Sequence, residues 1–173
     1  MPIKPCKKND LLVGMGGAAS MIKEIDFQNI SLLKTLFELQ QASYQVEAEL
    51  IQFFEIPPLI ESFNDFRQCG ETFLGYFEEN ELVGALSFTI DGEELTICRM
   101  IVHPNHFRKG IAQKLLNYVE ETNKEITVLK VSTGKDNSPA KGLYYKLGYH
   151  LVWDLEVAPE FYISQFEKKL GND

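Results

Sequence analysis

The chain is poor in several features that define whole classes of protein. Among its 173 residues no apolar run approaches the roughly 20 residues that span a bilayer, so we expect a soluble protein with no membrane partner. Its three cysteines, Cys6, Cys69 and Cys98, are widely spaced and include no Cys-x-x-Cys pair. This spacing argues against a disulfide framework or a zinc site and favours a reducing, cytoplasmic compartment.

Positive charge is also scarce. The chain has 17 Lys and Arg residues against 25 Asp and Glu residues, which gives a formal net charge of -8 at pH 7. A surface of this sign repels nucleic acid, so we expect no nucleic-acid partner, and it attracts cationic ligands. The chain also lacks a Gly-x-x-x-x-Gly-Lys-Ser/Thr loop, which weakens the case for a nucleotide hydrolase.

Residues 100 to 116 join an apolar strand to an amphipathic helix through a short basic turn. The first amides of a helix have no intrahelical partner, and the helix dipole adds partial positive charge there. A glycine at the start of the helix removes the side chain that would block a ligand. This turn therefore predicts a site for a diphosphate. The residues expected to hold it are Arg108, Lys109, Gly110, Ile111, Ala112 and Gln113.

A second block reads Asn-Ser-Pro-Ala-Lys-Gly-Leu-Tyr-Tyr-Lys-Leu-Gly-Tyr from residue 137 onward. Within it, Ser138 is expected to cap a short helix, and Pro139 to occupy the first helical position. Gly148 is expected to end the helix in a left-handed conformation. Tyr144 and Tyr145 lie about 100° apart around such a helix, so only one of them can face a given site.

With these two blocks in this order, the chain resembles the GNAT-type N-acetyltransferase superfamily. The superfamily's cofactor signature is Arg/Gln-x-x-Gly-x-Gly/Ala, and this chain departs from its first half because Phe107 stands three residues before Gly110 and the arginine is Arg108. The resemblance covers most of residues 21 to 170. It implies acetyl-CoA as the donor, no metal, and direct transfer to a primary amine of a small molecule or peptide in a ternary complex.

The resemblance also implies roles for individual residues. In the family, the fourth strand has a bulge whose free backbone groups bind the pantetheine arm and polarise the thioester carbonyl, and the matching residues are Met100, Ile101 and Val102. Asn137 matches a residue that contacts the cofactor. Tyr144 matches the cofactor-site tyrosine that protonates the departing sulfur, a role open to a phenol with a pKa of about 10.

The general base is the least determined part of this site. An alkylamine has a pKa of about 10.4, so an acceptor amine must lose a proton before it attacks the thioester. Glu47 and Glu49 fall where the family places its acceptor-binding loop, after the first helix, and Glu94 opens the fourth strand. Each is a candidate, acting directly or through water. The aromatic residues considered for the acceptor pocket are Tyr44, Phe53, Phe54 and Phe63.

The punctuation of the chain predicts the element order βααβββαβαββ, a mixed α/β (α+β) fold with a mostly antiparallel sheet flanked by helices. Residues 1 to 20 are expected to be a disordered extension or a segment foreign to the natural protein, and residues 21 to 173 a single N-acetyltransferase domain. Helices are expected over residues 30 to 45, 59 to 67, 110 to 122 and 139 to 147. Strands are expected near residues 22 to 25, 72 to 78, 81 to 90, 94 to 102, 126 to 132, 150 to 157 and 161 to 169.

Other hypotheses stay open beside this one. A non-catalytic module that binds acyl-CoA and reports it to a partner would use the same fold with a silent acceptor site. A metal site at Cys98, His103 and His106 would lack a matching second pair of ligands. Cys98, in the middle of a strand, is more typical of a small apolar residue than of a nucleophile. A homodimer is one assembly that the sequence permits.

Overall fold

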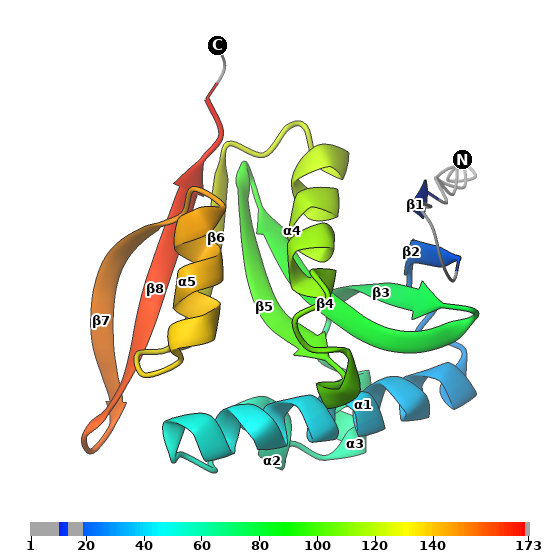
Figure 1. The fold of residues 1–173 in the computed structure, drawn as a ribbon, viewed down its shortest axis with the longest axis horizontal. Coiled ribbons are helices and arrows are strands. Elements are labelled where there is room, and N and C mark those ends of the chain that lie inside the picture. The colour runs from blue at the N-terminus through cyan, green and yellow to red at the C-terminus, as the bar shows by residue number, and fades with distance from the viewer. Residues whose placement is uncertain (1–10, 14–18, 172–173) are drawn as a thin grey trace.

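The structure is a computed structural model that describes residues 11 to 13 and 19 to 171 (Figure 1). Its strands form one sheet with the order β1-β2-β3-β4-β5-β6-β8-β7. Within the described residues every neighbouring pair of strands is antiparallel except β5 with β6, which are parallel. The mixed, mostly antiparallel sheet expected from the sequence is confirmed.

The elements follow the expected order closely. The strands are β1 Leu11–Val13, β2 Ser20–Glu24, β3 Thr72–Glu78, β4 Glu81–Asp91, β5 Glu94–Val102, β6 Val128–Gly134, β7 His150–Ala158 and β8 Phe161–Lys169. The helices are α1 Ile30–Ile51, α2 Pro57–Ile60, α3 Phe63–Arg67, α4 Ile111–Thr122 and α5 Ser138–Lys146, with a 3-10 turn, η1, at Pro104–His106.

Three boundaries differ from the expectation. Leu11–Val13 pairs with residues 20 to 22 of β2, although disorder was expected there, and the rest of residues 1 to 18 lies outside the described residues. The single helix expected over residues 59 to 67 is divided into α2 and α3, because Glu61 and Ser62 are extended, with ψ angles of 151° and 158°. Helix α1 continues to Ile51 instead of ending near residue 45.

The extra length of α1 has a packing cause. Tyr44, Ala48 and Ile51 continue the buried stripe that Leu33 and Leu36 begin, at spacings of three to eight residues. After residue 45 only Ala48 and Ile51 of α1 are buried, one side chain per turn, so the apolar periodicity of this part of the sequence is weak. As a result Glu47 lies on the helix rather than in a loop after it, and its position is fixed by helical geometry.

Two apolar cores lie on the two faces of the sheet. Helices α4 and α5 cover one face, where Leu115, Leu129 and Phe166 are fully buried. Helices α1 and α3 cover the other, where Leu33 and Phe66 are fully buried. Complete burial of such a side chain contributes about 1.5–3 kcal/mol, so both helical layers are held firmly against the sheet.

The sheet opens between its two parallel strands. Residues 94 to 97 of β5 pair with residues 128 to 131 of β6, and beyond Ile97 the two strands separate (Figure 1). Ser87 of β4 pairs with Arg99 whereas Phe88 pairs with Ile97, so Cys98 is an extra residue that forms a bulge in β5. The bulge was expected at residues 100 to 102, and it lies two residues earlier.

The bulge changes which face each later side chain of β5 occupies. Ile97 belongs to the core under α4, whereas Ile101 belongs to the core under α1. Met100 and Val102 pack partly against the α4 side. None of the helices in the described part of the chain combines the length and the apolar character that crossing a membrane requires.

Candidate active site

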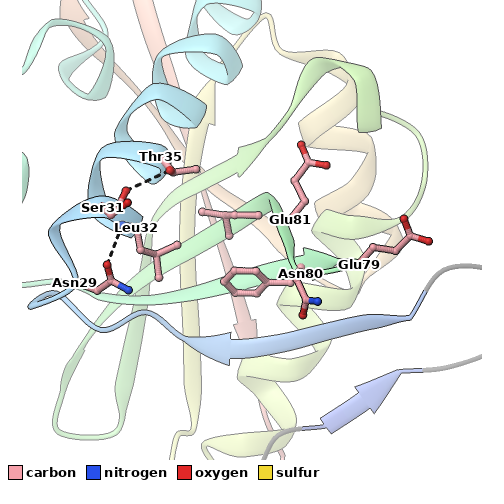
Figure 2. Close-up of a pocket in the computed structure, with 9 residues that line it drawn as sticks. Asn29, Ser31, Leu32, Thr35, Glu79, Asn80 and Glu81 are labelled. Atoms are coloured by element: carbon pink, nitrogen blue, oxygen red, sulfur yellow. Dashed lines mark hydrogen bonds between the residues drawn. The ribbon is translucent and has the colours of Figure 1, made fainter.

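A cavity of about 1190 Å³ lies where β5 and β6 separate. Its walls come from α1, β5, the turn before α4, helix α5 and the hairpin formed by β7 and β8. A second pocket, of about 580 Å³, lies between the start of α1 and the turn that joins β3 to β4 (Figure 2). That pocket is lined by Glu79 and Glu81 and by no Lys or Arg, so it suits an anionic cofactor poorly.

One end of the large cavity is the turn that the sequence marked as a diphosphate site. Gly110 precedes α4 with φ of +75°, a conformation that strains residues with a side chain. No side chain caps α4, and Lys114 N donates to Gly110 O at 3.0 Å. The amides of Ile111, Ala112 and Gln113 therefore precede the first intrahelical donor and are available to a ligand.

The charges around this turn are distributed differently from the expectation. Arg108 lines the cavity, with φ of +63°. Lys109 is not among the lining residues, and its Nζ lies 3.4 Å from Nδ1 of His106. Lys146, at the end of α5, lines the cavity instead and lies 3.4 Å from Oε1 of Gln113. Sequence reasoning missed Lys146, because no local motif brings the end of α5 to the start of α4.

The backbone amides of β5 that face the cavity already have partners. Met100 N donates to the Tyr44 hydroxyl at 3.3 Å, and Val102 N donates to Ser43 Oγ at 3.1 Å. Ile101, the third residue expected at this position, is fully buried in the core under α1 and does not line the cavity. Two of the three expected backbone positions therefore face the cavity, and both are capped by side chains of α1.

Glu47 reaches the cavity from α1 and is held by two neutral donors. Its Oε1 accepts from Asn137 Nδ2 at 3.2 Å and from Thr133 Oγ1 at 3.5 Å. Burial raises the pKa of the Glu47 carboxyl, and these two hydrogen bonds offset part of that effect. The site therefore contains an oriented carboxylate that binds a proton more readily than an exposed glutamate does.

Asn137 connects this carboxylate to α5. Its Oδ1 accepts from Ala140 N at 3.2 Å, so Asn137, and not Ser138, is the N-cap of the helix. The sequence assigned the cap one residue too late, because Asn and Ser are both strong capping residues and stand side by side. Gly148, with φ of +90°, follows the helix in the expected left-handed conformation.

Tyr144, on α5, lines the same cavity as Glu47, on α1. Its side chain is 4% exposed and packs against Tyr149 and Phe166, with ring centroids 5.7 and 5.6 Å away. Within the described part of the chain its hydroxyl makes no hydrogen bond, and it lines the cavity. Burial, reinforced by the charge of Glu47, raises the pKa of Tyr144, so the phenol is protonated at neutral pH. Tyr145 is 51% exposed and points elsewhere, as helical geometry predicted.

Other residues considered from the sequence do not reach the cavity. Glu94 forms an ion pair with Lys130 at 2.8 Å at the far end of β5, outside the lining residues. Glu49 is exposed and accepts from Gln45 at 3.2 Å. Of the four aromatic candidates, Tyr44 and Phe53 line the cavity and Phe54 and Phe63 do not.

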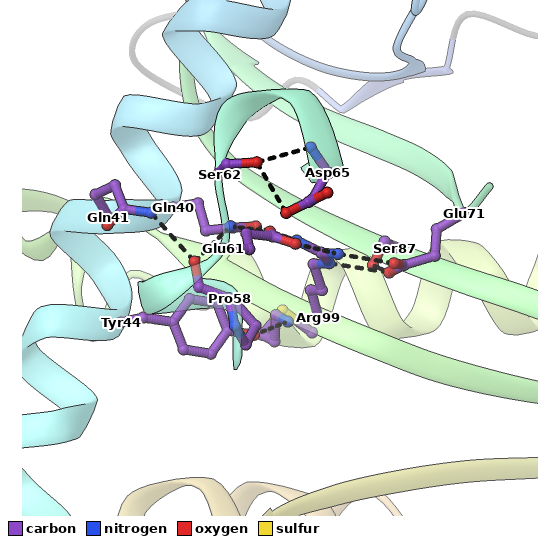
Figure 3. A network of polar contacts seen from close by, with 11 residues as sticks. Gln40, Gln41, Tyr44, Pro58, Glu61, Ser62, Asp65, Glu71, Ser87 and Arg99 are labelled. Carbon is purple, nitrogen blue, oxygen red and sulfur yellow. Dashed lines mark hydrogen bonds and ion pairs between the residues drawn. The ribbon is translucent and has the colours of Figure 1, made fainter. Parts of the chain in front are cut away.

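A buried ionic network lies next to α1 and forms part of the cavity lining (Figure 3). Arg99, with a side chain 8% exposed, donates to Glu71 through Nε at 3.0 Å and through Nη2 at 2.8 Å. It also pairs with Glu61, and it donates to Gln40 Oε1 at 2.9 Å. Burial opposes the guanidinium charge, but the hydrogen bonds to Glu71 and Glu61 outweigh it and raise the pKa of Arg99. Burial likewise opposes the Glu71 charge, yet Arg99 and Ser87 hold the pKa of Glu71 below its ordinary value.

Sequence comparison places this architecture in a known family. Residues 33–149 match the acetyltransferase (GNAT) family, and the chain belongs to that family. The resemblance drawn from the two sequence blocks is thereby confirmed. The chain is 33% identical over 146 residues to the UPF0157 protein YqkA of Bacillus subtilis (strain 168), and the match covers 84% of this chain. Because it covers 43% of YqkA, the chain spans less than half of that relative.

Solved structures share the fold at low sequence identity. The ribosomal-protein-S18-alanine N-acetyltransferase of Escherichia coli superimposes with a TM-score of 0.70 at 13% identity, over 89% of this chain and 97% of that one. PaiA N-acetyltransferase of Thermoplasma acidophilum, in complex with coenzyme A, gives 0.66 at 21% identity, over 87% and 99%. The yncA protein of Salmonella typhimurium with its cofactor acetyl-CoA gives 0.65 at 15% identity, over 89% and 95%.

Proposed function

We propose that the protein transfers an acetyl group from acetyl-CoA to the neutral primary amine of a small molecule or peptide, by direct attack in a ternary complex. The observation that carries the proposal is the cavity at the open end of the sheet, with unpaired helix amides at one end and Glu47 beside Tyr144 further in. We place the reaction in a cytoplasmic domain that comprises residues 21 to 173. Membership of an acyltransferase family supports the reaction type.

The cofactor in this proposal extends along the cavity from α4 to β5. Its diphosphate would accept from the amides of residues 111 to 113 and pair with Arg108 and Lys146. Lys109 does not line the cavity and would contribute its positive charge from the adjacent surface. The pantetheine arm of the cofactor would follow β5 past Met100, whose amide stays bonded to the Tyr44 hydroxyl, and would accept from the Val102 amide once Ser43 moves away. Asn137 and Ala112 border the arm. A change of the Ser43 χ1 rotamer moves its Oγ away from the Val102 amide and frees that donor.

Three proton movements accompany the acetyl transfer. Glu47 accepts a proton from the acceptor ammonium, directly or through water, and its raised pKa suits that task at neutral pH. The neutral amine nitrogen then bonds to the acetyl carbon. As the carbon–sulfur bond breaks, Tyr144 gives its proton to the thiolate and the nitrogen releases its second proton to water. Tyr144 recovers a proton from Glu47. Orientation of two bound reactants lowers the barrier by roughly 7–11 kcal/mol, so no covalent intermediate is required.

The alternative function is a sensor that binds acyl-CoA without transferring the acyl group. Calorimetry with acetyl-CoA, followed by chromatographic measurement of free coenzyme A in the presence of a panel of amines, separates the two functions. An enzyme binds acetyl-CoA and releases coenzyme A with at least one amine, whereas a sensor binds and releases none. Chromatography is preferable to a thiol reagent, because Cys98 is an exposed free cysteine that would itself react. Absence of binding would overturn both functions.

A further inference from the structure

The cavity extends beyond Glu47 into a region that carries its own chemistry. We call this region the acceptor end: it is lined by the second half of α1, Phe53, residues 55 to 58, Glu61, Glu71, Arg99 and the hairpin formed by β7 and β8. The cofactor end is the part bordered by the turn before α4 and by α5. The reacting point between the two ends is marked by the Tyr144 hydroxyl, which lies on a side chain only 4% exposed and has no hydrogen-bond partner among the described residues.

Negative charge predominates at the acceptor end. Four carboxylates line it, on Glu47, Glu55, Glu61 and Glu71, and the cation among its lining residues is Arg99. One guanidinium cannot neutralise two carboxylates, so the ionic network keeps a net negative charge. Glu47 and Glu55 add two further negative charges. The donors to Glu47, Thr133 and Asn137, are neutral and do not compensate its charge. A positively charged ligand is therefore attracted to this end.

Arg99 has no donor left for a ligand. A guanidinium has five N–H donors. Nε donates to Glu71 at 3.0 Å, Nη2 donates to Glu71 at 2.8 Å and to Glu61 at 3.3 Å, and Nη1 donates to Gln40 at 2.9 Å and to Glu61. These contacts use all five donors, so a carboxylate on the acceptor would find no partner at Arg99.

The remaining cations of the cavity are at its other end. Arg108 belongs to the turn before α4, and Lys146 to the end of α5. In the proposed complex the cofactor phosphates occupy Arg108 and Lys146. A ligand carboxylate at the acceptor end would thus lie among glutamates with no compensating charge, which is strongly unfavourable in a partly buried site.

The acceptor end also has an apolar wall. Phe53, after α1, stacks on Phe161, at the start of β8, with ring centroids 3.8 Å apart and planes at 4°. Val157 and Ile163 of the same hairpin line the cavity beside them, as does Leu50 of α1. This surface can bury a chain of methylene groups, at about 0.8 kcal/mol per buried group.

We propose that the acceptor is a small aliphatic diamine or polyamine: an amine with an apolar body, a second positive charge and no carboxylate. The inference rests on the proposed acetyl transfer. One amine lies between Glu47 and Tyr144 and is acetylated. The alkyl chain lies along the Phe53–Phe161 wall, and the second ammonium lies toward Glu55 and the residual charge of the Arg99 network.

Matched amines test this inference. Cadaverine and lysine differ by one carboxylate, and cadaverine and pentylamine differ by one ammonium group. With acetyl-CoA and wild-type protein, we expect kcat/KM for cadaverine to exceed that for lysine roughly tenfold or more, and that for pentylamine roughly fivefold. Equal efficiency with lysine and cadaverine would overturn the inference while leaving the acetyltransferase in place. If acetyl-CoA binds but none of the amines causes release of coenzyme A, the enzyme and the acceptor class would be overturned together.

A pair of variants locates the second charge. Glu55→Gln removes an exposed carboxylate that lines the cavity, whereas Glu49→Gln removes an exposed carboxylate nearby that does not. We expect Glu55→Gln to lower kcat/KM for cadaverine roughly fivefold and to leave pentylamine unchanged, and Glu49→Gln to change neither. An equal response of cadaverine to both variants, or an equal loss for both amines with Glu55→Gln, would contradict the placement of the second ammonium.

Discussion

Replacing Tyr144 with phenylalanine separates a proton donor from a packing residue. The ring packs against Tyr149 and Phe166, whereas the hydroxyl makes no hydrogen bond within the described part of the chain. Phenylalanine keeps the ring contacts and removes the hydroxyl alone. We therefore expect the free energy of unfolding to change by less than about 1 kcal/mol, because no internal hydrogen bond is broken.

Turnover should respond quite differently from stability. A positioned general acid contributes roughly 10²–10⁴-fold, and a thiolate is a better leaving group than an amine or alkoxide, so we expect kcat to fall about 100-fold. The Kd for acetyl-CoA should change by less than about threefold, since the phenol is assigned to the transition state rather than to cofactor binding. Chromatographic measurement of coenzyme A release gives kcat, and calorimetry gives Kd.

Tyr145→Phe is the matched control, because the neighbouring ring is 51% exposed and carries no assigned role. It should behave as the wild type in both assays. The assignment of Tyr144 would be refuted by a Tyr144→Phe protein with unchanged kcat. A variant that lost turnover, cofactor affinity and thermal stability together would show that Tyr144 acts through packing.

Three other substitutions test the site and the network that supports it. Glu47→Gln should lower kcat about 100-fold. Burial raises the pKa of Glu47, so the wild type loses stability as pH rises above the unfolded pKa of about 4.3. The variant has no such loss and should be the more stable protein at pH 8. In denaturant titrations the difference in unfolding free energy should vanish in acid. Ser43→Ala frees the Val102 amide and should tighten acetyl-CoA binding about threefold by calorimetry, so weaker binding would contradict the proposed path of the pantetheine arm. Glu71→Gln should lower the free energy of unfolding by about 3 kcal/mol at pH 7. Because the pKa of Glu71 is held low, this loss should shrink as pH falls through that low value, and a pH-independent loss would argue against an ionic role for Glu71.

Local sequence patterns predicted the parts of this molecule that depend on neighbours in the chain. The turn before α4 is set by Gly110 and the apolar spacing after it. The turns from β3 to β4 and from β4 to β5 are set by short dipeptides, with Glu79 and Asn80 at φ of 48° and 69° in the first and Gly92 at 59° in the second. Gly148 ends α5 for the same reason. Each of these signals lies within a few consecutive residues, so the fold class and the conformation of the turn before α4 could be predicted from the sequence.

The parts that the sequence missed depend on contacts between distant segments. The bulge at Cys98 is defined by the register of β5 against β4, which no pattern within β5 reveals. Glu47 was one of three candidates, and it is distinguished by hydrogen bonds to Thr133 and Asn137, on β6 and at the start of α5. The roles of Lys146 and of the saturated Arg99 likewise emerge only when separate elements converge.

The early end of the parallel ladder has a mechanical consequence. Strands β1 to β5 and strands β6 to β8 form two blocks. Within the described residues the ladder between them covers four residue pairs, from Glu94 with Val128 to Ile97 with Val131, and Thr127 N and Val128 N add bonds to Glu93 O at its near end. A cofactor wedged between the blocks would add cross-links beyond that short seam. Loading the protein should therefore make the two halves melt as one unit, and slow deuterium uptake at the Val102 amide more than at the outer strands.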